Sequence, residues 1–337
     1  MIELLNVGDR GGAGFSLPIR ATPVMELLNT GDRGGAGFSL PIRATPVIEL
    51  LNTGDRGGAG FSLPIRATPV MELLNTGDRV EIGSYHVFSR FREATAFVRD
   101  QGSDLAVVVE ETKGAGPVQM VVRGCDFARI DSLAVLPERV VLDGAAFEIR
   151  SRYRSQLNVG RIDATTLTRN LHALGAALLE SAPARSMAFQ SGSESAFESA
   201  LARRFRHGIG LLLGGNLESG ARAIAGLGFG LTPSGDDFLA GFLLGMFAVD
   251  SPALDRRRLY QAARSLNPFS ESLLRCAADG CCIEPAQSLI HALFAGTPAE
   301  VVRHTTRLSA VGASSGADLA AGLYSFLASS VSPGVPS

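Results

Sequence analysis

The sequence predicts an α+β fold, in which a small antiparallel β domain precedes a mainly α-helical domain that carries a Gly-rich loop motif. Short β-branched and aromatic segments, separated by turn residues, occupy positions 80–158. Helical apolar patterns occupy positions 159–329. Because no helical period separates consecutive strand segments, the pattern disfavours a parallel doubly wound sheet. With 46% apolar and 19% charged residues, the chain of 337 residues can form a sizeable core.

The β domain is expected from its turns as much as from its strands. Three segments have the composition of turns or loops: Gln101-Gly102-Ser103, Lys113–Pro117 and Asp143-Gly144. The strands expected between and around them are Tyr85–Phe91, Leu105–Glu111, Val118–Val122, Arg139–Asp143 and Ala146–Arg150. Their spacing is typical of a small antiparallel sheet or barrel.

The helical domain shows apolar residues at spacings of three and four. Asp163 can cap the first helix, which we expect to run to Ala182. Thr297 can cap a helix that has Pro298 in its first turn. The further helices expected are Glu194–Leu213, Ser234–Val249, Ala253–Leu266, Phe269–Ala278, Pro285–Phe294, Pro298–Ser309 and Ser315–Ala328. Residues 330–337 are expected to form a frayed tail.

The N-terminus contains a tandem repeat. Ile2–Val24, Met25–Val47 and Ile48–Val70 are near-identical copies of a 23-residue unit, and Met71–Arg79 begins a fourth copy. The copies are nearly identical and rich in glycine and proline. These two features predict that residues 1–79 are a poorly packed extension, or that the native start is Met25 or Met71. The alternative is an interaction arm or small solenoid.

Composition excludes several function classes. A net charge of −2 and a pI near 6.2 disfavour nucleic-acid binding. The longest apolar run, Phe238–Val249, is too short for a membrane span of about 20 residues. The start lacks a signal-peptide pattern, so the cytoplasm is the expected compartment. The four cysteines lack metal or disulfide spacing and are expected to be reduced and mostly buried: Cys125, Cys276, Cys281 and Cys282.

The most specific segment is the Gly-rich motif from Gly226 to Asp237. Its alternating glycines would let backbone amides approach a ligand. Ser234 stands where a helix should begin, and the first turn of a helix favours anions or acidic side chains. Asp236 and Asp237 would either satisfy that helix end or bind a cation or a ligand amide. An ordinary capped helix is the structural alternative.

A second segment repeats part of this motif. Ser315–Gly322 aligns with Ser234–Gly241 in the pattern S-G-x-D-x-x-A-G, which places Asp318 at the position of Asp237. Two helix N-termini could therefore converge on one ligand. Alternatively, the pattern serves helix packing twice, because its second glycine permits close contact.

Other candidates are weaker. The five histidines show no metal-binding spacing and are expected on the surface or in the core. The basic clusters Arg203–His207 and Arg256–Arg258 are typical of solvated helix faces, although such a cluster could also attract a phosphate.

Three blocks of the helical domain resemble a known family. The blocks resemble, in order and spacing, a family that includes the third subunit of the oxamate carbamoyltransferase of bacterial allantoin breakdown. They are Gly228–Gly241, Phe269–Gly280 and Val311–Gly322, and the upstream segment Tyr85–Arg90 resembles the same family. The resemblance covers about residues 80–328. It implies carbamoyl transfer between oxalurate or oxamate and phosphate or carbamoyl phosphate, in a hetero-oligomer.

We therefore expect a subunit of a carbamoyltransferase-like enzyme that binds a small anionic substrate and other enzyme subunits, but neither nucleic acid nor membrane. The expected catalytic residues are Asp236, Asp237 and Asp318. The expected ligand-binding residues are Gly228, Gly230, Thr232, Ser234, Gly235, Ser314, Ser315 and Gly316. No cofactor is fixed; Mg²⁺ on Asp236 and Asp237 is one option. The alternatives are a non-catalytic ligand-binding or scaffold subunit, and an Asp-dependent metal hydrolase.

Overall fold

The computed structural model describes residues 71–160, 163–183, 186 and 196–331 of the chain. The three complete repeats, and the expectations attached to them, lie outside the described residues. Thr68–Ser337 form one compact unit. Within the described part, no helix is both long enough and apolar enough to cross a bilayer.

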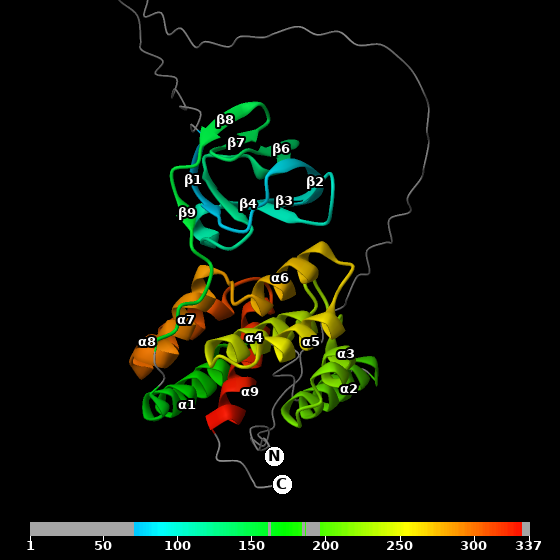
Figure 1. The fold of residues 1–337 in the computed structure, drawn as a ribbon, viewed down its shortest axis with the longest axis vertical. Helices are drawn as coiled ribbons and strands as arrows, with labels where there is room; N and C mark the ends of the chain where they lie inside the picture. The colour runs from blue at the N-terminus through cyan, green and yellow to red at the C-terminus, as the bar shows by residue number, and fades with distance from the viewer. Residues whose placement is uncertain (1–70, 161–162, 184–185, 187–195, 332–337) are drawn as a thin grey trace, which may run out of the picture. The chain divides into compact units, whose positions relative to one another are not determined.

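The first half of this unit is a curled sheet, which is drawn from blue to green in Figure 1. Its strands are β1 (Glu72–Gly77), β2 (Gly83–Phe91), β3 (Ala94–Arg99), β4 (Leu105–Glu110), β5 (Gln119–Arg123), β6 (Ser132–Val135), β7 (Arg139–Leu142), β8 (Ala145–Glu148) and β9 (Arg152–Tyr153). They pair in the order β8-β7-β6-β2-β3-β4-β5-β1-β9. The sheet curls far enough for β8 to contact β1.

The sheet is mixed rather than purely antiparallel, which corrects part of the fold prediction. β4 pairs with β5 in parallel, as does β1 with β9, whereas the other neighbours are antiparallel. Strand direction depends on which segments meet in space, and alternation along one strand does not specify it. β3 was not predicted because four consecutive residues of it are buried, so no alternation marks the strand. β6 and β9, of four and two residues, were not predicted either.

The strand β1 corrects the predicted start of the fold. It belongs to the fourth repeat copy, which we had placed in the poorly packed extension. It pairs antiparallel with β5, with Leu73 opposite Val122. The following Asp78 accepts hydrogen bonds from the Ser155 amide at 3.0 Å and the Ser155 hydroxyl at 2.6 Å. This copy is ordered because the folded chain offers it two strand partners, a property that its own sequence cannot reveal.

The interior of the sheet is filled by alternating side chains from most of its strands. Phe97, Met120, Val122 and Val140 are fully buried there. Their neighbours on β3 and β5, Ala96, Val98 and Val121, are buried as well, so these central strands are covered on both faces. The sheet therefore encloses its own cluster of buried apolar side chains.

The second half is helical. In order, its α-helices are α1 (Ala164–Ser181), α2 (Ala196–Leu213), α3 (Leu217–Ile224), α4 (Ser234–Ala248), α5 (Ala253–Ala263), α6 (Pro268–Ala278), α7 (Glu284–Ala295), α8 (Pro298–Ser309) and α9 (Ser315–Val331). All eight expected helices are present with small shifts at their ends. α3 was missed because it is short and contains a glycine. α9 runs to Val331, three residues beyond its expected end, so the expected tail began too early.

The helices α4 and α9 form the centre of the helical half. Nearly every side chain of α4 is buried, including the polar ones in its first turn. α4 and α9 make the most extensive contact of any two helices described, and Figure 1 shows them crossing beside α1 and α6. A helix that is apolar all round is typical of a protein core.

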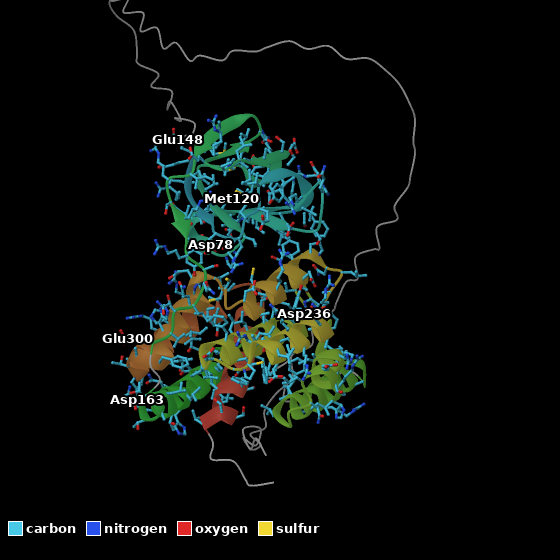
Figure 2. All side chains as sticks on the ribbon, viewed as in Figure 1. Asp78, Met120, Glu148, Asp163, Asp236 and Glu300 are labelled. Carbon is cyan, nitrogen blue, oxygen red and sulfur yellow. The ribbon has the colours of Figure 1, made fainter. Side chains whose placement is uncertain are left out.

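The sheet and the helices contact one another through α6. Arg275 of α6 donates a hydrogen bond to Asp104, just before β4, at 3.0 Å. The Leu157 amide donates to the Gly280 carbonyl at 2.8 Å. Figure 2 shows side chains filling the region between the strand that precedes Asp78 and the helix that carries Asp236. These contacts place β4 and β5 beside the first turns of α4 and α9.

Candidate functional site

The two sequence motifs begin the helices α4 and α9 in closely similar ways. In the first motif, the Leu227 amide donates to the Ile224 carbonyl at 3.0 Å, and the Gly235 amide donates to the Leu227 carbonyl at 2.8 Å. In the second, Val311 bonds Leu308 at 2.9 Å, and Gly316 bonds Val311 at 3.1 Å. The same helix–loop–helix connection is therefore built twice.

These bonds change the expected role of two amides. We predicted that the amides of Gly235 and Gly316 would face a ligand. Both already donate within their own loops. A Cβ on either glycine would lie 1.8 Å from the carbonyl oxygen of Ile224 or Leu308, respectively. These two glycines therefore allow each helix to start against the end of the preceding helix.

The second glycine of each motif brings α4 and α9 together. A Cβ on Gly241 would lie 1.8 Å from the Leu319 carbonyl oxygen, and one on Gly322 would lie 1.9 Å from that of Phe238. Each glycine thus contacts the backbone of the other helix. This reciprocal contact favours the packing interpretation for Gly241 and Gly322. It also sets the two helix N-termini near each other.

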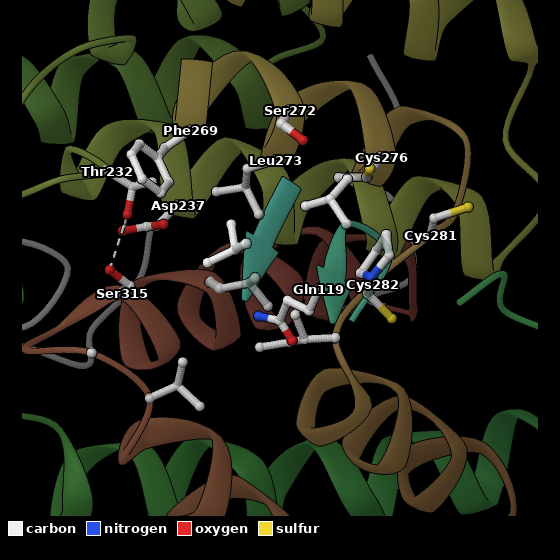
Figure 3. A pocket seen from close by; sticks show the side chains of 18 of the residues that line it. Gln119, Thr232, Asp237, Phe269, Ser272, Leu273, Cys276, Cys281, Cys282 and Ser315 are labelled. Carbon is white, nitrogen blue, oxygen red and sulfur yellow. Dashed lines mark hydrogen bonds between the residues drawn. The ribbon is translucent and has the colours of Figure 1, made fainter. Parts of the chain in front are cut away.

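Asp237 connects the two N-termini through hydroxyl groups. The Thr232 hydroxyl donates to Asp237 Oδ2 at 3.1 Å. The hydroxyl oxygens of Thr232 and Ser315 lie 3.1 Å apart and share a hydrogen bond. Figure 3 shows the three side chains converging from the two segments. The two motifs therefore contribute to one polar cluster.

The surroundings of Asp237 disfavour its charged form. The residue is 2% exposed, and burial raises the pKa of its carboxyl to about 8. The hydroxyls of Ser315 and Thr232 lower this pKa in part, whereas the charges of Asp318 and Asp236 raise it further. The carboxyl is therefore predominantly protonated at pH 7, and can donate a hydrogen bond or a proton.

A cavity of about 290 Å³ opens beside this cluster. Thr232, Asp237, Ser315 and Gly316 line it from the motifs. The rest of its wall comes from β4, the β5 region, α6, the segment after α6 and later turns of α4 and α9. Those side chains are mostly apolar and include Leu105, Val107, Val118, Phe269, Leu273, Ile283 and Leu319. A small apolar pocket with a few convergent polar groups is the usual form of a small-molecule site.

Two polar atoms in the cavity wall have no hydrogen-bond partner among the described residues. They are Gln119 Oε1, beside the sheet, and Ser272 Oγ, on α6. Figure 3 shows Gln119 well separated from the Asp237 cluster. Buried polar atoms are nearly always paired in folded proteins. A bound molecule that spans the cavity could pair with both.

The other two candidate aspartates do not line this cavity. Asp236 accepts a hydrogen bond from the Gly226 amide at 2.7 Å, and burial raises its pKa. Asp318 is fully buried and accepts from the Ser186 hydroxyl at 2.5 Å. Its charge nevertheless acts on Asp237, so the two equivalent aspartates of the motifs lie close together.

The remaining candidates have mainly conformational positions. Gly228 and Gly230 adopt φ angles of 112° and 110°, which favour glycine. Ser234 and Ser314 are buried at the starts of α4 and α9, outside the cavity wall. Among the described residues, no three His, Cys, Asp or Glu side chains are placed to hold a metal ion. The arrangement therefore gives the Mg²⁺ option no support.

Three cysteines in the cavity wall were not expected there. Cys276, Cys281 and Cys282 are free and buried, as the sequence predicted for the cysteines, and all three line the cavity. Burial raises the pKa of Cys276 to about 12 and also raises that of Cys282. Since the thiolate is the nucleophilic form, these two thiols are inert near pH 7. The resemblance block Phe269–Gly280 was the signal that could have placed α6 at the site.

The helices that form this site are also the part of the chain that matches a known family. Residues 224–327 match the family model for the oxamate carbamoyltransferase subunit AllH. The suspected resemblance is thereby confirmed over that range. No solved structure matches the chain.

The AllH match begins at the end of α3 and extends through most of α9. It includes both S-G-x-D-x-x-A-G segments and the whole of α6. The sheet residues of the cavity, such as Leu105 and Gln119, lie before the matched range. The helical part of the site therefore lies within the matched range, whereas the sheet part does not.

Proposed function

We propose that this chain is a subunit of an oxamate carbamoyltransferase-type enzyme, and that the cavity beside Asp237 binds the oxamate or oxalurate group. The observation that carries the proposal is a buried carboxyl group held between two helix N-termini at one end of a small apolar cavity, where burial raises its pKa. The AllH match supports the reaction class.

The carboxyl of Asp237 can supply the proton that carbamoyl transfer requires. When phosphate attacks the carbamoyl carbon of oxalurate, a C–O bond forms and the C–N bond to the oxamate nitrogen breaks. The departing nitrogen takes a proton from Asp237, and the proton that the attacking hydrogen phosphate releases restores the Asp237 carboxyl; in the reverse reaction both transfers run the other way. A general acid works best when its pKa lies near the working pH, as that of Asp237 does.

The cavity wall indicates which part of the reaction takes place here. Among the described residues, the wall contains no arginine or lysine. Phosphate and carbamoyl phosphate carry more charge than an apolar wall can stabilise. Thr232, Ser315 and Gln119 suit the amide and carbonyl groups of oxamate instead. In this proposal, the phosphate binds at the edge of the cavity or on another subunit.

The same observation supports a second candidate, a subunit that binds the ligand without catalysing the reaction. The described cavity wall has no cationic side chain, and its Cys276 and Cys282 thiols are inert. Such a wall can bind a small amide while a partner subunit catalyses the reaction. The Asp-dependent metal hydrolase has no comparable support among the described residues.

Adjacent aspartates provide a matched test of the two candidates. Asp237→Asn keeps the size of the side chain but cannot transfer a proton. We expect the turnover of the assembled enzyme to fall by about 10²–10⁴-fold, while oxamate affinity changes less, because an amide can still hydrogen-bond. Asp236→Asn, outside the cavity, is expected to spare turnover. The measurements are phosphate-dependent turnover with the partner subunits, calorimetric titration of oxamate, and a melting curve.

The outcomes separate the two roles. Lost turnover with retained oxamate binding, in Asp237→Asn alone, supports the catalytic role. Normal turnover in Asp237→Asn with weakened binding in Ser315→Ala would assign a binding role instead. If neither variant changes turnover or oxamate affinity, the cavity is not the site.

A further inference from the structure

A second cavity, of about 650 Å³, lies between α5, α6 and the end of the fourth repeat copy. Arg256, Arg257 and Tyr260 of α5 line it, together with Arg275 of α6 and Arg79 after β1. Asp279 is the acidic residue in its described wall. Four arginines against one aspartate give this wall a formal charge of +3.

The arginines keep much of their hydrogen-bonding capacity. Arg257 is exposed and makes no ion pair among the described residues. Arg79 forms a loose ion pair at 3.6 Å to Asp279 and also contacts the Cys281 thiol, and the side chains of Arg79 and Asp279 are about half exposed. The Nε of Arg256 is buried without a hydrogen-bond partner in the described structure, although its Nη1 donates to the Ser251 carbonyl.

The other contacts hold two of these side chains in place. The Arg256 guanidinium lies 5.1 Å from the centre of the Phe247 ring, which fixes its orientation. Arg275 is anchored to Asp104 at 3.0 Å and is 42% exposed, so its outer face remains available. Another acid beside this wall, Glu271, accepts a hydrogen bond from Tyr260 and pairs with Arg264 at 3.3 Å.

We propose that this arginine cavity binds a small molecule that carries at least two phosphate or carboxylate groups. Guanidinium groups bind such anions in bidentate geometry, and several of them from separate elements can hold more than one anionic group. A concave site of this volume fits a small molecule better than a flat protein surface does. The cavity has a different wall from the Asp237 cavity, and the proposal does not depend on the proposed function.

The test compares neighbouring arginines of α5. Arg258 pairs with Asp255 at 3.9 Å and lies outside the cavity wall, so Arg258→Gln is the matched control for Arg257→Gln. The probe is pyrophosphate, titrated calorimetrically into the full chain at fixed ionic strength. We expect one site per chain, a Kd raised about 10-fold or more in Arg257→Gln, and a change under about 2-fold in Arg258→Gln.

Titrations with other ligands and variants identify the class of ligand. Inorganic phosphate should bind at least about 10-fold more weakly than pyrophosphate, because it engages fewer guanidinium groups. Citrate tests whether carboxylates can replace phosphates. Arg275→Gln and the melting curves of all variants show whether binding is lost with the fold intact. No pyrophosphate binding at millimolar concentration, or equal weakening in Arg257→Gln and Arg258→Gln, would overturn the proposal. Tighter binding of a Glu-rich peptide would assign the cavity to a protein segment instead.

Discussion

Asp237 and Asp163 are both acids at helix N-termini, but their surroundings shift their pKa values in opposite directions. Asp163 is exposed, and the Thr166 hydroxyl, followed by the Thr166 amide that donates to it at 2.9 Å, lowers its pKa. Asp237 is buried among apolar groups and other acids, which raises its pKa. Position on a helix therefore does not determine the charge of an acid. The depth of burial decides it.

The raised pKa of Asp237 predicts a specific dependence of stability on pH. Between about pH 4 and pH 8, the folded chain holds a proton on Asp237 that the unfolded chain has released. The unfolding free energy therefore falls as pH rises through this window, and the loss is complete above about pH 8. Asp237→Asn removes this contribution. We expect its melting temperature, relative to the wild type, to increase steadily from pH 5 to pH 9.

Calorimetric melting at pH 5, 7 and 9 checks this expectation. Asp255→Asn, at a half-exposed position in the first turn of α5, is the control and should show no such trend. Parallel pH profiles for Asp237→Asn and the wild type would mean that the carboxyl is charged in the folded chain. The general-acid role would then lose its physical basis.

At the scale of elements, helix ends follow local rules whereas helix contacts do not. Thr297 and Glu300 form a capping box at the start of α8. Asn267 caps α6 in front of Pro268, through a bond to the Phe269 amide at 2.9 Å. Such caps need only a few neighbouring residues, so they can be predicted from sequence. By contrast, the contact between Gly241 of α4 and Leu319 of α9 depends on the tertiary structure.

The crossing of α4 and α9 can be tested with alanine. Gly241→Ala places a methyl group where the Leu319 carbonyl oxygen lies 1.8 Å away, so the helices must separate. We expect a loss of about 3 kcal/mol in unfolding free energy or a failure to fold, at or beyond the upper end of ordinary overpacking. Chemical denaturation of the purified chain measures it.

The matched control is Gly210→Ala on α2, where an added Cβ meets no atom within 4 Å. Alanine is the better helix former, so this variant should gain about 0.5–1 kcal/mol. Similar stability in Gly241→Ala and the wild type would contradict the close crossing of α4 and α9.

At the scale of the whole molecule, the sheet depends on one copy of a sequence that occurs four times. β1 lies between β5 and β9, and the Asp78 that follows it binds Ser155. The segment Ile48–Arg56 has the same sequence as Met71–Arg79 except at its first residue. We therefore expect that Ile48–Arg56, if placed directly before Val80, can form the same strand.

Deletions in the repeat region test that dependence. A chain that starts at Met71 should retain the full unfolding free energy, since Thr68–Ser337 form one compact unit. Removal of residues 71–79 alone should abolish cooperative melting or cost several kcal/mol, because β5 and β9 lose their partner. Removal of residues 57–79 moves Ile48–Arg56 directly before Val80 and should restore wild-type melting.

Thermal melting of the three deletion variants shows whether the complete repeats or β1 itself contribute to stability. Loss of stability in the chain that starts at Met71 would show that the complete repeats contribute to the fold. Equal melting of the 71–79 and 57–79 deletions would show that the strand itself is dispensable.

The sequence by itself determined the α+β class, the order of sheet and helices, and the boundaries of most helices. These features depend on periodicity, caps and turns, which act over a few residues. It also marked Asp237 and Ser315, because the two motifs share a pattern. Only the tertiary structure decided that Met71–Arg79 joins the sheet, that Gly235 and Gly316 serve packing, and that Gln119 and α6 complete the cavity. Strand pairing, close contacts between backbones and burial all involve residues that are far apart in the chain. Local sequence patterns therefore do not predict which residues meet.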